Sequence, residues 1–208
     1  MAQTIQAQDI GLNDLETKFK LAYSQDNQFF REWRDELPEI SESEKHFLDR
    51  IKSNYLNLIK YPPMLENAVK MVVLSPLLDL GGFYQHPFRI STEKSVEIIS
   101  EDEGTIVKGK IDVLVLQEQL WILVIEAKKA QFSLELGIPQ ALTYMMDTPN
   151  PAQPTFGFVT NGSNFIFIKL MKQDTPIYAL SDEFTLRRAN DLYNVLSVLK
   201  KLGTLNKS

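Results

Sequence analysis

Residues 109–116 read Gly-Lys-Ile-Asp-Val-Leu-Val-Leu, and residues 121–128 read Trp-Ile-Leu-Val-Ile-Glu-Ala-Lys. Apolar, β-branched runs of this length predict buried strands, and the short connection between them predicts an antiparallel hairpin. Asp112 interrupts the first run, and Glu126 lies at the end of the second. A lone ionised carboxylate in a buried strand costs several kcal/mol unless a partner compensates it. The hairpin therefore carries two acidic groups that need a neutralising partner.

A hard divalent cation is the partner that these residues predict. With the turn near residues 117–120, Asp112 and Glu126 lie near the same end of the hairpin, so both can reach one ion. Lys128 follows Glu126 by two residues and projects to the same face, and the carbonyl of Ala127 between them can add an oxygen ligand. Mg²⁺ prefers a few oxygen ligands and retained waters, with Mn²⁺ as a substitute. The residues leave open an ordinary solvated ion pair between Glu126 and Lys128.

Helices and further strands surround this hairpin. The spacing of apolar residues predicts helices over about 12–37, 41–59, 64–78, 134–146 and 187–202. It predicts further strands over 88–90, 95–100, 155–160, 164–170 and 177–180, with a tight turn at Asn161-Gly162-Ser163. This order predicts an α/β fold in which helices flank a mixed β-sheet. We expect an N-terminal helical arm over residues 1–60 and one domain over residues 61–208.

Composition excludes several classes of protein. The chain has 208 residues, of which 44% are hydrophobic and 24% charged, as in an ordinary globular protein. It has no cysteine, which excludes disulfides, Fe–S clusters and thiolate zinc sites. No stretch approaches the ~18 apolar residues of a membrane span, and the polar N-terminus does not resemble a signal peptide. We therefore expect a cytoplasmic protein that is not associated with a membrane.

The net charge of −5 is unfavourable for a partner of nucleic acid, but its distribution weakens this objection. Residues 1–50 hold 11 acidic and 6 basic residues, whereas residues 51–208 hold 16 of each. A neutral body can carry a local basic strip, and bound divalent cations would add positive charge. DNA is therefore a compatible partner. The acidic arm is expected either to form a homodimer contact or to shield the DNA groove.

Three motifs follow one another along the chain: Gly109-x-Ile111-Asp112, Glu126-x-Lys128 and Gln140-x-x-x-Tyr144. Together they resemble the PD-(D/E)xK nuclease superfamily, in particular the N-terminal nuclease domain of type I restriction enzyme R (motor) subunits and recombination nucleases. The resemblance extends over about residues 66–170, and Thr160-Asn161-Gly162 also fits the restriction-subunit pattern. It implies a restriction-endonuclease-like sheet. Ile111 replaces the proline that names the superfamily, a departure common in the restriction-subunit branch.

The resemblance implies roles for individual residues. The two acids of the family bind Mg²⁺ and its lysine serves the nucleophile, so these roles pass to Asp112, Glu126 and Lys128. The other implied site residues are Glu66, as a further catalytic acid, and Gln140 and Tyr144, as substrate-binding residues. Gln140 and Tyr144 are one helical turn apart and share a face. The residues alone leave open a solvated helix glutamate at position 66 and ordinary helix packing for the Gln–Tyr pair.

The sequence thus predicts a Mg²⁺-dependent deoxyribonuclease that hydrolyses DNA phosphodiester bonds as an endonuclease or exonuclease, in defence against foreign DNA or in repair. Gly104-x-x-x-x-Gly109-Lys110 resembles a phosphate loop, but Ile111 follows it in place of Ser or Thr and a strand replaces the helix. No ATPase motor is expected. The alternative is a nuclease-fold module that binds DNA or a protein without cutting, which the acidic pI of about 5.2 favours.

Overall fold

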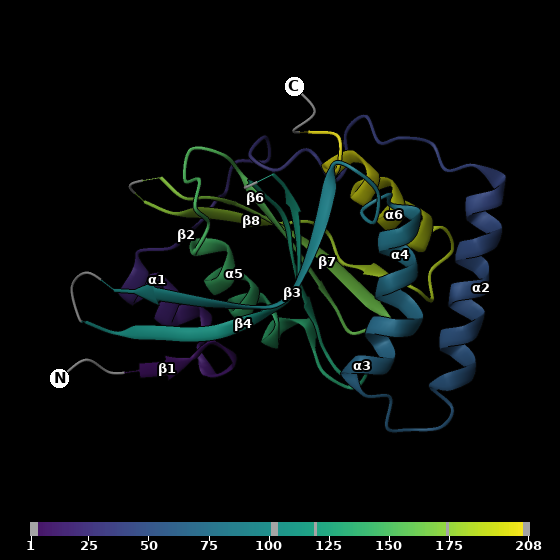
Figure 1. Cartoon of the computed structure of the whole chain (residues 1–208), viewed down its shortest axis with the longest axis horizontal. Helices are drawn as coiled ribbons and strands as arrows, with labels where there is room; N and C mark the ends of the chain where they lie inside the picture. Colours follow the sequence, from purple (N-terminus) through teal and green to yellow (C-terminus); the bar gives the residue numbers. More distant parts are fainter. Residues whose placement is uncertain (1–3, 101–103, 119, 174, 206–208) are drawn as a thin grey trace.

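The computed structural model describes residues 4–100, 104–118, 120–173 and 175–205. A nine-stranded mixed sheet runs through the described part of the chain (Figure 1). Its order is β1-β4-β5-β6-β7-β8-β2, with β3 paired to β4 and β9 paired to β7. The strands are β1 (Thr4–Gln6), β2 (Ala22–Tyr23), β3 (Phe88–Ile99), β4 (Ile106–Gln117), β5 (Leu120–Ala127), β6 (Thr155–Thr160), β7 (Asn164–Met171), β8 (Ile177–Leu180) and β9 (Phe184–Thr185).

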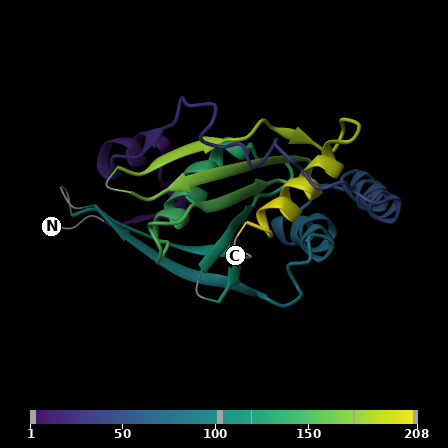
Figure 2. The same cartoon turned by 90° about the horizontal axis from the view of Figure 1, so that it is seen from above.

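Helices cover both faces of the sheet (Figure 2). The helices are α1 (Leu12–Phe19), α2 (Glu42–Leu58), α3 (Glu66–Val69), α4 (Ser75–Leu80), α5 (Ile138–Met146) and α6 (Asp191–Leu202), with 3₁₀ turns η1 (Ala7–Asp9) and η3 (Leu134–Leu136) and a π-helical segment η2 (Lys70–Leu74). One face packs against α2, α4 and α6, and the other packs against α1 and α5. None of the described helices combines the length and apolar character required to cross a membrane.

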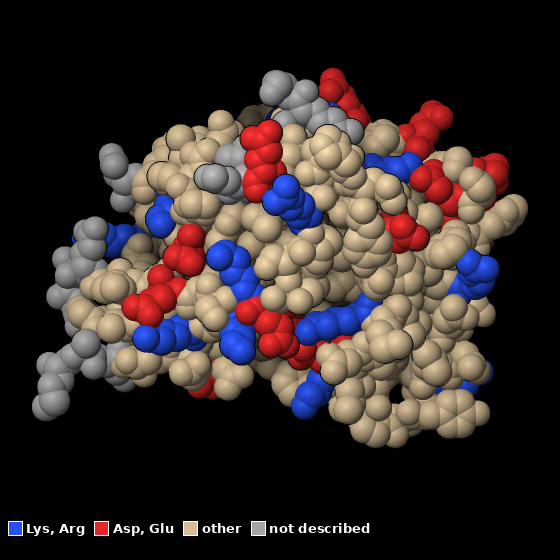
Figure 3. Space-filling model, in the orientation of Figure 1, with Lys and Arg blue, Asp and Glu red and all other residues tan. Residues whose placement is uncertain are grey.

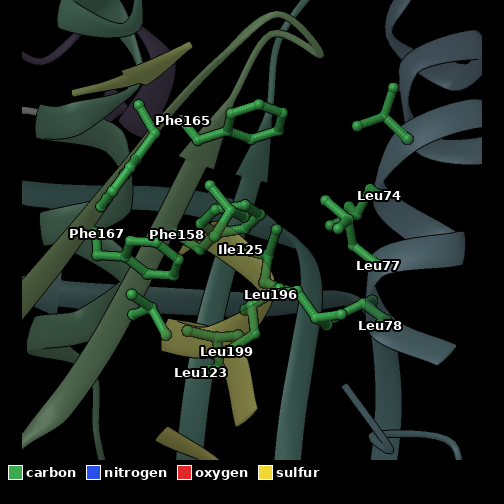
Figure 4. Packing of buried hydrophobic residues seen from close by; sticks show 14 of the residues in the cluster. Leu74, Leu77, Leu78, Leu123, Ile125, Phe158, Phe165, Phe167, Leu196 and Leu199 are labelled. Atoms are coloured by element: carbon green, nitrogen blue, oxygen red, sulfur yellow. The ribbon is translucent and has the colours of Figure 1, made fainter. Parts of the chain in front are cut away.

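The larger of the two hydrophobic clusters lies between the sheet and the helices α2, α4 and α6. Strand β5 divides its side chains between the clusters, because Leu123 and Ile125 point into this one and Val124 points towards α5. Figure 4 shows how helices and strands meet in the larger cluster, with labelled residues Leu74, Leu77, Leu78, Leu123, Ile125, Phe158, Phe165, Phe167, Leu196 and Leu199. Each such side chain stabilises the fold by about 1.5–3 kcal/mol when fully buried.

The central hairpin and the α/β class are confirmed. Strands β4 and β5 pair antiparallel, with Val113 opposite Ile125, and β5 pairs parallel with β6. Gln119, in the predicted turn, lies outside the described residues. The second hairpin is also present, because β6 and β7 pair antiparallel on either side of Gly162, whose φ of 88° suits a glycine. The predicted mixed sheet flanked by helices is therefore the observed architecture.

The single helix expected over residues 12–37 is wrong. Helix α1 ends at Phe19, where Lys20 takes a left-handed φ of 56°, and residues 22–23 form β2 beside β8. The apolar residues that suggested a longer helix serve the core instead: Phe30 is 4% exposed, and Trp33 meets Phe184 edge-on. Residues 4–6 pair parallel with β4, so the first 60 residues are not exclusively helical. The division at residue 60 and the homodimer stay predictions.

The helix expected over residues 64–78 spans residues 66–80 and contains a π-helical segment. Pro76 explains the π segment, because it has no N–H to donate and its ring would clash with the carbonyl four residues earlier in a regular α-helix. The amide of Ser75 accordingly bonds to the carbonyl of Lys70, five residues back. The widened turn begins at Lys70, whose side chain lies in the site described next.

Candidate active site

Asp112 lies at an interruption of the long β3–β4 ladder, whose two strands Figure 1 labels. The paired positions run through Thr92–Val113 and Lys94–Ile111, but no pair is formed between Glu93 and Asp112, and Glu93 has a φ of 54°. Strict alternation would place Ile111 and Val113 on one face of the sheet. Ile111 packs in the cluster with α5 instead, while Val113 packs in the cluster with α4. The strand therefore changes face at Asp112, at the junction of the two clusters.

The hairpin register brings Asp112 beside the end of β5. Val113 pairs with Ile125 at the end of the β4–β5 ladder, and Asp112 and Glu126 are the next residues beyond that pair. The backbone N–H of Ala127 donates to Oδ2 of Asp112 over 2.9 Å. Burial raises the pKa of Asp112, and its contact with Lys70 opposes that rise. The two acids of the predicted motif thus lie on neighbouring strands at the same end of the hairpin.

Glu126 is the most buried acid of this group, with 2% of its surface exposed. Its Oε1 forms an ion pair with Nζ of Lys128 at 2.8 Å. Its Oε2 is buried without a hydrogen-bond partner. Burial first, and the negative charge of Asp112 second, raise the pKa of Glu126 to about 8. The protein therefore holds an acid whose charged form is poorly compensated.

Lys128 is fixed in place by a chain of hydrogen bonds that leads into the interior. Its ammonium donates to Oε1 of Gln140, and Nε2 of Gln140 donates to the hydroxyl of Tyr144 over 2.7 Å. The same hydroxyl has a hydrogen bond with the backbone of Lys110 on β4. Gln140 and Tyr144 are 8% and 1% exposed. Both lie behind Lys128 in this chain of hydrogen bonds, and the expectation that they bind substrate stays a prediction.

Two glycines make this arrangement possible. A Cβ on Gly109 would lie 2.7 Å from Cε1 of Tyr144, so only glycine lets the tyrosine ring rest against the β4 backbone. A Cβ on Gly137 would lie 2.6 Å from Val159 and 3.4 Å from Cε of Lys128. The glycine of the first sequence motif therefore has a packing function, because it makes room for the tyrosine of the third.

Glu66 joins the group through a second lysine. Nζ of Lys70 lies 2.7 Å from Oε1 of Glu66 and 2.7 Å from Oδ1 of Asp112. Glu66 and Lys70 are one helical turn apart, across the boundary between α3 and η2. The structure thus places the predicted third acid on the far side of Lys70 from Asp112.

The loop after β5 is held by the predicted Thr160-Asn161-Gly162 segment. The amide of Lys128 donates to the carbonyl of Thr160 over 2.8 Å. Nδ2 of Asn161 donates to the carbonyl of Phe132 over 2.8 Å, while its Oδ1 accepts from the amide of Asn164. The turn between β6 and β7 therefore fixes the path of the chain that leaves Lys128.

Comparison with known proteins identifies the family. Residues 8–175 match the family model described as the N terminus of the type I restriction enzyme R protein. The chain belongs to this family. Membership in a family of restriction-enzyme segments implies a nuclease-like domain of restriction type, in agreement with the resemblance inferred from the sequence motifs.

Solved structures related to this R-protein domain are distant in sequence. A chain from a cryoEM structure of the DrdV–DNA complex is 13% identical, with a TM-score of 0.48 over 74% of this chain and 96% of that chain. A fragment described as an HsdR subunit of a type I restriction enzyme from Vibrio vulnificus YJ016 is 18% identical, with a TM-score of 0.40. That match covers 65% of this chain and 26% of the fragment. No curated protein matches, so the family assignment rests on the family model.

The donors present in this R-protein domain suit a hard cation. Asp112 and Glu126 offer carboxylate oxygens, and the buried, unpartnered Oε2 of Glu126 is the atom that an ion would satisfy. Among the described residues, no three His, Cys, Asp or Glu side chains are grouped closely enough to hold a metal ion. Lys70 forms ion pairs with both Glu66 and Asp112. Asp112 and Glu126, with the carbonyl of Ala127, fit a site that completes its shell with water.

Lys70 is the site residue that the sequence motifs did not reveal. One signal was available, since a lysine four residues after a helical glutamate forms a common surface pair. Nothing in that pattern says that the lysine reaches a strand residue 42 positions away, as Lys70 does with Asp112. The positions of Asp112, Glu126 and Lys128 relative to one another were expected from the hairpin alone.

Proposed function

We propose that this chain is a Mg²⁺-dependent deoxyribonuclease of restriction type, which hydrolyses phosphodiester bonds of DNA. One observation carries the proposal: Glu126 is buried beside Asp112, with one carboxylate oxygen unpartnered and its pKa raised to about 8. An acid in that state is poorly compensated by the protein alone. Membership in a restriction-enzyme family supports nuclease chemistry at the same place.

Asp112, Glu126 and the carbonyl of Ala127 would hold the ion. When bound, Mg²⁺ supplies positive charge against the developing charge of the phosphate and lowers the pKa of water. The N–H of Ala127 fixes Oδ2 of Asp112, and Lys128 fixes Oε1 of Glu126. Glu126 thus has one oxygen held by the protein and Asp112 has both, because its Oδ1 also accepts from Lys70, so the orientation of both carboxylates is set before an ion arrives.

Lys128 would orient the attacking water or bind the scissile phosphate. An ammonium has three N–H donors, and Glu126 and Gln140 accept two of them. The third is left for a water or phosphate oxygen, because 15% of the lysine side chain is exposed. In the reaction a water oxygen forms a bond to phosphorus while one P–O ester bond breaks. Gln140 and Tyr144 would keep the ammonium aligned during that step.

The proposed substrate is DNA, and the face of the protein in Figure 3 carries no continuous basic patch. Figure 3 shows acidic and basic side chains interspersed on the visible face. Binding without a divalent ion should therefore be weak and sensitive to salt, since phosphate contacts dominate affinity for DNA. We place this reaction in the cytoplasm, in restriction of foreign DNA.

Supercoiled plasmid gives a direct test of the proposed function. Purified protein with Mg²⁺ or Mn²⁺ should nick or linearise the plasmid, and EDTA should stop the reaction. Asp112→Asn keeps the size of the side chain and should abolish cleavage, whereas Asp35→Asn, at an exposed ion pair with Arg31, should not. Cleavage that continues undiminished in Asp112→Asn would overturn the assignment.

The alternative function is a nuclease-fold module that binds without cutting. The net charge of −5 is the observation that favours it. Calorimetric titration with Mg²⁺ separates the two functions, since a catalytic site should bind the ion at millimolar concentration, more strongly with DNA present. Absence of metal binding, together with retained DNA or protein binding, would favour the alternative.

A further inference from the structure

The ammonium of Lys70 occupies a position that suits a cation. Its Nζ lies 2.7 Å from a carboxylate oxygen of Glu66 and 2.7 Å from one of Asp112. The side chain is 25% exposed, so most of this contact is sheltered from solvent. Contacts with both acids raise the pKa of Lys70 despite its burial, which shows how strongly the surroundings favour a positive charge there.

We infer that Lys70 is a resident cation that a divalent metal ion must displace, and that its displacement frees Glu66 and Asp112 for the ion. This inference rests on the proposed function, because it concerns the same metal site. It gives Lys70 a role that the sequence motifs do not assign. It also gives Glu66 two states, as the partner of Lys70 without metal and as a ligand or water-holding acid with it.

The charge of the site supports an exchange of one cation for the other. Glu66, Asp112 and Glu126 contribute three negative charges when ionised, and Lys128 contributes one positive charge. Without Lys70 the balance is therefore −2, which one divalent ion neutralises. With both Lys70 and the ion in place the balance would be +1, and like charges within a few ångströms repel. Lys70 alone leaves a balance of −1 and the ion alone leaves zero, so the group is matched best by the divalent ion with Lys70 displaced.

The surroundings of Lys70 leave room for its side chain to move. Lys70 and Asp112 line an open cavity of about 360 Å³ on the protein surface, together with Asn67, Tyr84 and Glu93. Glu93 is an exposed acid whose nearest ion-pair partner, Lys110, lies 3.8 Å away. A displaced ammonium can therefore stay in a hydrated cavity beside another carboxylate.

The π-helical segment gives the exchange a local structural basis. It starts at Lys70, and its wider turns replace the regular hydrogen bonds over residues 70–74. Such segments often occur at functional sites, where they shift side chains relative to a regular helix. Residues Val73 and Leu74 of the same segment are buried, so the backbone is anchored while Lys70 projects from its first position.

Mn²⁺ affinity, measured by electron paramagnetic resonance and by calorimetry without DNA, tests the inference. Lys70→Met removes the ammonium and keeps an unbranched side chain, so Mn²⁺ should bind about tenfold more tightly, or better, than in the wild type. The matched control is Lys110→Met, which removes a nearby exposed lysine that touches neither Asp112 nor Glu66. A general change in the electrostatic potential would strengthen Mn²⁺ binding in both variants. Displacement of Lys70 predicts stronger Mn²⁺ binding in Lys70→Met alone.

A second measurement uses the unmodified protein and does not depend on a variant that folds. Amine-acylating reagent followed by mass spectrometry reports the reactivity of Lys70, which should rise several-fold on saturation with Mg²⁺ as the ion pairs break. Equal Mn²⁺ affinity in Lys70→Met and wild type, or weaker affinity in the variant, would overturn the inference while leaving the metal site intact. No Mn²⁺ binding in either protein would overturn the inference and the metal-dependent function together.

Discussion

Among the described residues, two lysine–glutamate pairs leave a buried glutamate oxygen without a hydrogen-bond partner, and one of these two pairs belongs to the candidate site. Lys128 and Glu126 have side chains that are 15% and 3% exposed, and Lys169 and Glu32 have side chains that are 14% and 21% exposed. Each glutamate leaves one buried oxygen without a hydrogen-bond partner. An unpartnered oxygen beside a lysine is therefore not sufficient to identify a metal site.

The second acid distinguishes the two pairs. Lys169 donates to Glu32 and to the carbonyl of Phe29, and its ammonium lies 5.2 Å from the centre of the Phe29 ring. This pair therefore contains one charge of each sign. Glu126 instead faces the negative charge of Asp112, which raises its pKa further. One pair joins the N-terminal segment to β7, whereas the other carries excess negative charge that an ion can use. The following predictions test this difference, from the largest expected effect to the smallest.

Neutralising Glu126 should lower the cleavage activity strongly, whereas neutralising Glu32 should leave it nearly unchanged. Glu126→Gln keeps the shape of the side chain and should lower plasmid cleavage by about a thousandfold, the equivalent of roughly 4 kcal/mol of lost transition-state stabilisation. Glu32→Gln should cleave at a rate within about twofold of the wild type, at a temperature where both are folded. Initial rates of nicking with Mg²⁺ measure both. Comparable losses in the two variants would show that the pairs do not differ in function.

Breaking the Lys169–Glu32 pair should lower the stability of the folded protein. Lys169→Met leaves Glu32 buried without its cation, so the free energy of unfolding should fall by about 3–5 kcal/mol. The lysine also holds the carbonyl of Phe29, so the loss should loosen residues 24–40 against the sheet. Urea unfolding followed by tryptophan fluorescence measures the change. A stability within about 0.5 kcal/mol of the wild type would mean that this pair behaves as a surface pair.

The raised pKa of Glu126 predicts how stability depends on pH in the presence of EDTA. The folded protein holds this proton up to about pH 8, whereas the ordinary value for glutamate is 4.5. The resulting stabilisation is complete below the ordinary value and is lost as the pH rises through the raised one. Stability should therefore fall by roughly a few kcal/mol between about pH 5 and about pH 8.

Glu126→Gln is the control for this pH dependence. The variant has no proton to lose at that position, so its stability should fall less over the same range and exceed that of the wild type near pH 8. Burial also raises the pKa of Asp112, which adds a slope of the same sign in both proteins. Saturating Mg²⁺ should flatten the wild-type curve, because the ion favours the charged form. Parallel curves for the two proteins would contradict the assignment of the raised pKa.

The sequence could predict the hairpin and the approximate place of its acids, because two apolar runs flank a short turn, but not the one-residue register shift between Val115 and Leu116. It could not predict the interruption at Asp112, since glutamate has no preference for the left-handed conformation that Glu93 adopts opposite it. The long helix predicted over residues 12–37 failed for a related reason. Phe30 and Trp33 fall at helical spacing, but they lie in an irregular segment whose aromatic side chains pack against the core. Lys70 was missed because its contact with Asp112 spans 42 residues.

The smallest expected effect concerns the hydrogen-bond chain behind Lys128. Tyr144→Phe removes the hydroxyl that accepts from Gln140, so the amide is held less firmly and the lysine is less well aligned. The maximal rate of cleavage should fall about fivefold, the equivalent of roughly 1 kcal/mol, while Mn²⁺ affinity stays the same. Tyr178→Phe provides a matched control, because Tyr178 is also buried, at 2% exposure, but lies on β8 against Tyr23. A loss of rate confined to Tyr144→Phe would show that the protein interior positions the lysine. An equal loss in both variants would instead attribute the effect to general loosening of the core around α5.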